Sequence, residues 1–266
     1  MKITSCFSRG FTTTRRLVMH RHAFTRVELL AVILALAGLG LLALPALGGS
    51  ASRSRLAQCF NNLRQVGAGF QSWAMNSGEK FPWQVRRSDG GQNNTGGSNP
   101  SAVNPFIHFA TISNELGTPR ILVCPSDYAK RPASDFSASS AGGLLHINFR
   151  NNSVGYLVGL DATLDRPGTI LSGDRNVRTS RAMLCGNTGI SANSLDGKDP
   201  GLGFTNGVHG LYGHVGSSDG SVQIGGRDLL QKLSLNSGDA FDLNAIGGPA
   251  PNNHVMVPGT PATVPE

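Results

Sequence analysis

The sequence predicts an α+β fold, in which one long N-terminal helix packs on a small antiparallel β-sheet. Three observations support this: apolar residues recur every three or four positions from Leu56 to Trp73, short apolar stretches separated by turn residues follow, and the chain holds 35 glycines but only 15% charged residues. The first pattern is typical of an amphipathic helix and the second of short antiparallel strands. The composition indicates a loop-rich globular protein and excludes a coiled coil.

An uncharged apolar segment precedes the amphipathic stretch. Residues 29–50 carry no charged side chain, and their core, LLAVILALAGLGLLALPAL, approaches the roughly 20 residues that a helix needs to cross a bilayer. Residues 1–23, before it, hold five basic residues, so we expect a single-pass helix with the N-terminus inside and the body of the chain exported. Both stretches together predict one helix over 24–78, ended by Gly78 and Pro82, unless Pro45 or Gly48-Gly49 bends it.

The basic charge of the chain is concentrated at its N-terminus. The formal net charge is +7, but residues 1–23 hold five basic residues and no acid, so the charge without this leader is +2. We see no later basic stripe interleaved with aromatic residues, which argues against a nucleic-acid partner. A cleavable secretory signal, including a twin-arginine signal at Arg15-Arg16, is an alternative interpretation of this region.

Glu28 argues against an ordinary signal sequence, because an acid at the mouth of an apolar run opposes insertion. It lies in the segment Ala23-Phe24-Thr25-Arg26-Val27-Glu28-Leu29-Leu30, which resembles the processing site of type IV prepilins and type II secretion pseudopilins. The resemblance implies that a prepilin peptidase cuts between Ala23 and Phe24 and N-methylates Phe24, which makes Glu28 the fifth residue of the mature chain. Ala23 replaces the family's usual glycine, and Arg26 replaces an apolar residue.

A role for Glu28 also follows from electrostatics. A carboxylate in a low-dielectric environment is costly unless it is paired, and the α-amino group of a neighbouring, staggered chain is a suitable partner. Alternatively, Glu28 stabilises the N-terminus of its own helix through the helix dipole.

The resemblance implies a pilin-like fold and a function without catalysis. The chain would be a pseudopilin of the inner membrane, with its globular domain in the periplasm and with other pseudopilins as partners. An alternative is a membrane-anchored module that binds a polysaccharide or secreted cargo through the loops 88–105 and 191–203. An exported hydrolase is disfavoured, because the chain has neither a G-x-S-x-G nor an H-E-x-x-H motif.

The exported domain is expected to span residues 79–246. The pattern predicts a polar loop over 88–105, a helix over 105–116 and strands at 121–124, 154–160, 169–171 and 183–185. The tail from 247 to 266, with five prolines and little apolar content, is expected to be disordered.

The segment from His209 to Gly220 holds two histidines and an aspartate at intervals of five. Positions five apart on a strand face opposite sides, so we do not expect His209 and His214 to converge. Asp219-Gly220 predicts a two-residue type I′ hairpin. The spacing of His209, Asp219 and Gly220 resembles the H-x9-D-G signature of a prepilin-type domain frequent in planctomycete and verrucomicrobial proteins. The stretches 124–127 (CPSD) and 173–176 (GDRN) also look similar to that group.

Two further sites remain open from the sequence. Cys6 lies in the leader; of Cys59, Cys124 and Cys185, a Cys124–Cys185 disulfide and buried free thiols are both reasonable. Asp196 and Asp199 in the loop 193–199 could bind calcium, since some major pseudopilins bind it late in the domain, but solvated turn residues explain them as well. No other cofactor is expected.

Overall fold

The computed structural model describes residues 25–93, 104–180, 193–237 and 253–258, with the backbone alone for 40–51, 193, 194, 237 and 253. The predicted processing site at Ala23 and Phe24, the strand predicted at 183–185, Cys6 and Cys185 lie outside these residues. The chain divides into two compact units, Met1–Gly49 and Ser50–Glu266, which are described separately. Helices and an antiparallel sheet are both present, which confirms the α+β class.

The first unit contains the first half of α1 (Arg26–Met75). Thr25 and Glu28 form a capping box at its start: Glu28 N–H donates to Thr25 Oγ1, and Glu28 Oε2 accepts from both Thr25 N–H and Thr25 Oγ1. Pro45 and Gly48-Gly49 fall within the helical residues. Within the residues whose side chains are described, no helix combines the length and the apolar character that a membrane span requires. The membrane span predicted at 29–50 includes residues 40–50, whose side chains are not described, so it stays a prediction.

The second half of α1 packs on the sheet of the second unit, as its amphipathic pattern predicted. Its buried hydrophobic residues recur at helical spacing, and they are Cys59, Leu63, Val66, Phe70 and Ala74. The helix ends at Met75, and Gly78 follows in the left-handed conformation with φ +68°. Glu79 N–H closes the end by donating to Ala74 O.

A six-stranded antiparallel sheet forms the centre of the second unit. Its strands are, in spatial order, β4 (Asn193–Leu195), β8 (Asn253–Met256), β1 (Tyr156–Gly159), β2 (Ile170–Asp174), β6 (Gly213–Ser217) and β7 (Val222–Gly225). A second antiparallel pair consists of β3 (Val177–Arg178) and β5 (Gly203–Phe204). β1 and β2 confirm the strands predicted at 154–160 and 169–171.

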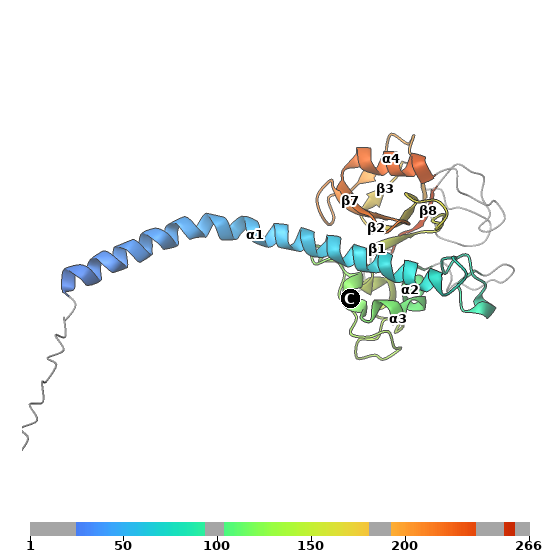
Figure 1. Ribbon diagram of the computed structural model, residues 1–266, viewed down its shortest axis with the longest axis horizontal. Helices are drawn as coiled ribbons and strands as arrows, with labels where there is room; N and C mark the ends of the chain where they lie inside the picture. Colours follow the sequence, from blue (N-terminus) through green and yellow to red (C-terminus); the bar gives the residue numbers. More distant parts are fainter. Residues whose placement is uncertain (1–24, 94–103, 181–192, 238–252, 259–266) are drawn as a thin grey trace, which may run out of the picture. The chain divides into compact units, whose positions relative to one another are not determined.

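The sheet has a hydrophobic core on each face. Figure 1 shows the second half of α1 on one side of the sheet and α4 (Arg227–Ser237) on the other. Along β1, Tyr156 and Val158 pack with the α1-side core, whereas Leu157 packs with the α4-side core. This is the alternation expected of a strand covered on both faces.

The short helices correct one prediction. The helix predicted over 105–116 is present as α2 (Pro105–Thr111) and α3 (Ser113–Leu116). The strand predicted at 121–124 is wrong, because η3 (Pro119–Leu122) is a 3-10 helix. Thr118 Oγ1 accepts from Arg120 N–H and Pro119 occupies the first turn, so the local capping signals outweigh the β-propensity of the apolar residues. In the described part of the chain, the other 3-10 helices are η1 (Arg87–Asp89) and η4 (Arg150–Ser153).

The prediction of a disordered tail over 247–266 is wrong for residues 253–256. They form β8, which pairs with both β1 and β4 inside the sheet. Val255 is fully buried, and His254 N–H donates to the buried carboxylate of Asp161. The globular domain predicted over 79–246 therefore extends beyond residue 246. The prediction rested on the average composition of the whole proline-containing tail, and such an average does not detect a strand of four residues.

Candidate functional site

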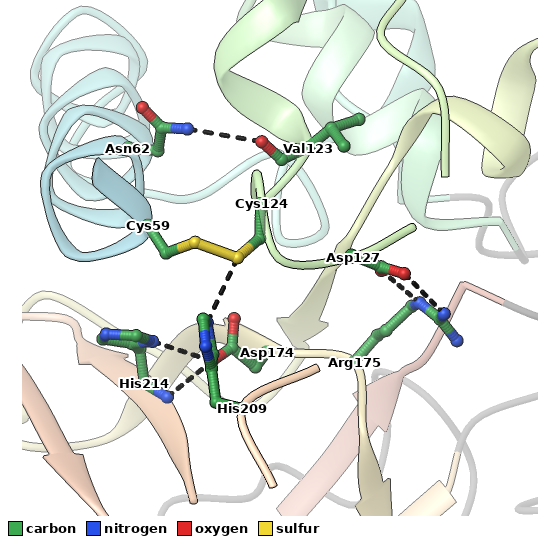
Figure 2. The surroundings of a disulfide bond; sticks show 9 residues. All are labelled: Cys59, Asn62, Val123, Cys124, Asp127, Asp174, Arg175, His209 and His214. Atoms are coloured by element: carbon green, nitrogen blue, oxygen red, sulfur yellow. Dashed lines mark hydrogen bonds and ion pairs between the residues drawn. A yellow bond between two sulfur atoms is a disulfide. The ribbon is translucent and has the colours of Figure 1, made fainter. Parts of the chain in front are cut away.

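A disulfide between Cys59 and Cys124 connects α1 to the segment after η3 (Figure 2). Both cysteines are fully buried. The pairing corrects the Cys124–Cys185 alternative and the free-thiol alternative for these two residues. Cys59 lies on the buried face of α1, and Asn62, one turn later, donates from Nδ2 to Val123 O at 3.3 Å, which holds Cys124 opposite the helix. The membership of Cys59 in the apolar stripe was the signal that could have suggested this pairing.

His209 and His214 do converge, contrary to the prediction. Their ring centroids are 4.8 Å apart, and both rings approach Asp174 on β2. The prediction assumed that one strand carries both residues, but β6 begins only at Gly213. His209 lies before a tight turn at Gly210, whose φ is +69°, and the turn folds His209 back beside the strand.

One oxygen of Asp174 organises this cluster. Asp174 Oδ2 accepts from the backbone N–H of His214 at 2.7 Å and lies 2.8 Å from its Nδ1. The same oxygen lies 3.7 Å from His209 Nε2, which in turn is 3.1 Å from Cys124 Sγ (Figure 2). The side chains of Asp174 and His214 are fully buried, and that of His209 is 3% exposed. Burial lowers the pKa of His209, and the charge of Asp174 only partly opposes this shift.

An ion pair borders the cluster. Asp127 accepts from Arg175 Nε at 2.5 Å and from Nη2 at 2.8 Å, and both side chains are largely buried. Nearby, Lys130 Nζ donates to Asn151 O; burial, followed by the charge of Arg175, lowers the pKa of Lys130 to about 8. The stretches 124–127 and 173–176 therefore meet here, through Asp127 with Arg175 and through His209 between Cys124 and Asp174. Both stretches are recognisable in the sequence, but no role for Asp127, Asp174 or Arg175 was predicted from it.

The predicted hairpin at Asp219-Gly220 is present, but its turn is not type I′. Ser217 N–H donates to Ser221 O, and Gly220 N–H donates to Ser217 O, so the loop has three residues. Gly220 has φ +82°, whereas Asp219 has no positive φ and accepts from Ser221 N–H and Oγ through Oδ1. This is the three-residue hairpin with a left-handed glycine at its end.

The three signature residues do not form one site; they anchor the two ends of β6. At one end, His209 contacts the disulfide that includes Cys59 of α1. At the other end, Gln71 of α1 donates to Ser218 O at 2.8 Å, and a Cβ atom at Gly220 would lie 3.1 Å from the Gln71 amide. Between them, His214 lies edge-on to Phe60. The spacing of the signature therefore matches a strand that runs along α1 from residue 59 to residue 71.

The aspartates considered as calcium ligands have protein donors. Asp199 accepts hydrogen bonds from Thr179 Oγ1, from Ser180 N–H and Oγ, and from Gly201 N–H. Asp196 accepts from Lys198 N–H, and the residues before it belong to β4. This gives Asp199 a role in holding the loop without an ion, so calcium binding stays a prediction.

A comparison of the chain with protein-family models, curated proteins and solved structures finds no match in any of the three.

Proposed function

We propose that this chain is a pseudopilin-like structural subunit: a prepilin peptidase cuts before Phe24, and the N-terminal helix then assembles the chain into a type II secretion pseudopilus or a related fibre. The observation that carries the proposal is the exposure of apolar side chains on α1 between Val27 and Leu39. Its large apolar residues there are between 48% and 75% exposed: Val27, Leu29, Leu30, Val32, Ile33, Leu34, Leu36 and Leu39.

Successive residues of a helix lie about 100° apart, so these side chains cover its whole circumference. A helix that is apolar all round is stable only when lipid or other helices surround it. In the proposed function this helical segment has both environments. It spans the inner membrane before assembly, in a single-pass N-in C-out arrangement, and it packs against neighbouring helices afterwards. The globular domain then lies in the periplasm, and its fold is pilin-like because one long helix both anchors it and contributes to its core.

Glu28 is the one acid in this helical segment. In the single chain it completes the capping box with Thr25, which is the intrahelical alternative considered from the sequence. Both hydrogen bonds from Thr25 reach Oε2, so Oε1 remains positioned to accept from the α-amino group of a neighbouring chain. Capping and pairing are therefore compatible, and their contributions to assembly can be separated by substitution.

Three variants separate the two roles. Glu28→Gln retains a capping side chain but loses the charge, Thr25→Ala removes the capping hydroxyl but keeps the charge, and Glu28→Ala removes both. The readout is the amount of subunit in the sheared fibre fraction, together with photo-crosslinking between helices in membranes. Each variant is first checked for processing by mass spectrometry.

The proposal predicts that Glu28→Gln and Glu28→Ala lose assembly while Thr25→Ala assembles. Normal assembly of Glu28→Gln would reduce Glu28 to a helix cap and contradict the pairing role. If the wild-type chain forms no fibre or helix contacts and retains a ligand in all variants, the protein is the membrane-anchored binding module instead.

A further inference from the structure

Four potential metal ligands meet beside α1. A ring nitrogen of His209 and the Sγ atoms of Cys59 and Cys124 all lie within 4.8 Å of one another, and Asp174, His209 and His214 form a second such group. Asp174 Oδ2 is 3.7 Å from Nε2 of His209. The four residues come from α1, the segment after η3, the turn before β6 and the end of β2, so the complete fold assembles them (Figure 2).

We propose that reduction of the Cys59–Cys124 disulfide converts this cluster into a tetrahedral Zn²⁺ site with Cys59, Cys124, His209 and Asp174 as ligands. In the oxidised protein a disulfide then joins Cys59 and Cys124, and in the reduced protein a zinc ion joins the two thiolates. The inference uses only the second unit of the chain and does not depend on the proposed fibre function.

The positions of the donor atoms suit zinc. Tetrahedral zinc bonds of about 2.3 Å to sulfur and about 2.0 Å to nitrogen or oxygen separate neighbouring ligand atoms by roughly 3.3–3.8 Å. Cys124 Sγ and His209 Nε2 are 3.1 Å apart, and His209 Nε2 and Asp174 Oδ2 are 3.7 Å apart. These two pairs reach that range by shifts of a few tenths of an ångström. Asp174 and the two cysteines belong to two separate groups that share His209, so Asp174 must also move toward the sulfur atoms when the disulfide opens.

The chemistry of the ligand set also suits zinc. Thiolate, imidazole and carboxylate are its usual protein ligands, and the imidazole must be neutral to bind. His214 serves as the outer partner: its backbone N–H and Nδ1 both engage Asp174 Oδ2 and orient the carboxylate.

A site made of Asp174, His209 and His214 alone is less suitable, although these residues are also close together. A metal on His214 Nδ1 would displace the hydrogen bond to Asp174 and transfer the ring proton to Nε2. In the structure, His214 Nε2 is buried and has no hydrogen-bond partner among the described residues. The proton would then occupy a position without an acceptor, which is costly.

The conversion balances as two steps. A dithiol reductant transfers two electrons and two protons to the disulfide, giving two thiols and the oxidised reductant. Zn²⁺ then binds and displaces both thiol protons. In reverse, a disulfide oxidant accepts two electrons from the zinc-bound thiolates and two protons from water and becomes a dithiol, while the Cys59–Cys124 bond reforms and Zn²⁺ is released.

The test uses the full-length protein in detergent with Cys6→Ser and Cys185→Ser, so that the remaining thiols are Cys59 and Cys124. Oxidised and phosphine-reduced samples are titrated with Zn²⁺, and with Co²⁺ as a spectroscopic probe. The reduced protein is expected to bind one ion per chain, with the charge-transfer band of cobalt thiolate and the visible bands of tetrahedral cobalt. The oxidised protein is expected to show neither.

Matched variants test the assignment of ligands. Cys124→Ser removes one of the two thiolate ligands, so the charge-transfer band of the two-thiolate cobalt site is lost. His214→Asn weakens metal binding by about 10- to 100-fold, because His214 no longer orients Asp174. His254→Asn is the control, since His254 on β8 makes the same two contacts with Asp161. It should leave the affinity unchanged.

Three results would overturn the proposal: equal binding by oxidised protein, binding that survives loss of both cysteines, or no binding by reduced protein. The first two would assign the metal to Asp174, His209 and His214. If reduction loosens the fold, near-ultraviolet circular dichroism remains decisive, because zinc must restore the native signal and a failure to do so counts against the site.

Discussion

Cys59 on α1 is covalently bound to Cys124, 65 positions further along the chain. The bond closes a loop that contains α2, α3 and η3, and it fixes the second half of α1 to the rest of the second unit. Opening this disulfide is proposed to create the zinc site. Loss of the disulfide also lowers the stability of the fold.

Removing the disulfide with Cys124→Ser is expected to lower the free energy of unfolding by about 4 kcal/mol. A loop of this length contributes that much in the chain-entropy description, because the bond restricts the unfolded chain. Urea unfolding in the presence of a metal chelator measures the difference, and Cys185→Ser is the control for loss of a thiol. A difference below about 1 kcal/mol would contradict a native disulfide between these residues.

Replacing Arg175 with methionine should destabilise the protein by about 3–5 kcal/mol, because Asp127 remains as a buried charge without its bidentate partner. Arg178→Met, three residues later on β3 and exposed, should change stability by less than about 0.5 kcal/mol. Thermal unfolding of both variants makes the comparison. Similar melting temperatures for the two would show that the ion pair contributes little.

The signature glycine is expected to be structural. Gly220→Ala should cost about 1–2 kcal/mol, because the left-handed conformation disfavours a Cβ atom and that atom would press on the Gln71 amide. Gly67→Ala in α1 should instead stabilise by roughly 0.5–1 kcal/mol, since its Cβ meets no atom within 4 Å. Equilibrium unfolding of both variants should give opposite signs; stabilisation by Gly220→Ala would exclude this explanation of the signature.

Asp199 is expected to make stability depend on acid pH. Hydrogen bonds, first from Ser180 and then from Thr179, lower the pKa of Asp199 below its ordinary value of 3.8. The stabilisation is therefore complete above the ordinary pKa and is lost as the pH falls through the lower pKa of the folded protein. The gap in urea midpoint between wild type and Asp199→Asn should be widest near neutral pH and shrink below about pH 4. Asp196→Asn, with a single hydrogen bond from Lys198 N–H, should show a much smaller gap.

The sequence was sufficient for features that follow from local pattern. The apolar stripe identified the buried face of α1, Gly78 marked its end, and the short apolar runs located β1 and β2. It was insufficient where distant segments meet. The Cys59 pairing and the Asp127–Arg175 ion pair join residues 65 and 48 positions apart, and no local pattern encodes such contacts.

The error about His209 and His214 has a local cause. Residues five apart face opposite sides only on a continuous strand, whereas Gly210 turns the chain before β6 begins. The glycine was visible in the sequence, and its consequence for the direction of the His209 side chain was not. β8 was missed for a related reason, because its partners β1 and β4 stabilise a strand too short to recognise alone.

The central claim is that the chain is processed as a prepilin. Mass spectrometry of the N-terminus of membrane-purified protein tests it most directly. The proposal predicts a mature chain that begins at Phe24 with a methylated α-amino group and places Glu28 fifth. An intact Met1, or cleavage after Leu47 or Ser50, would contradict it.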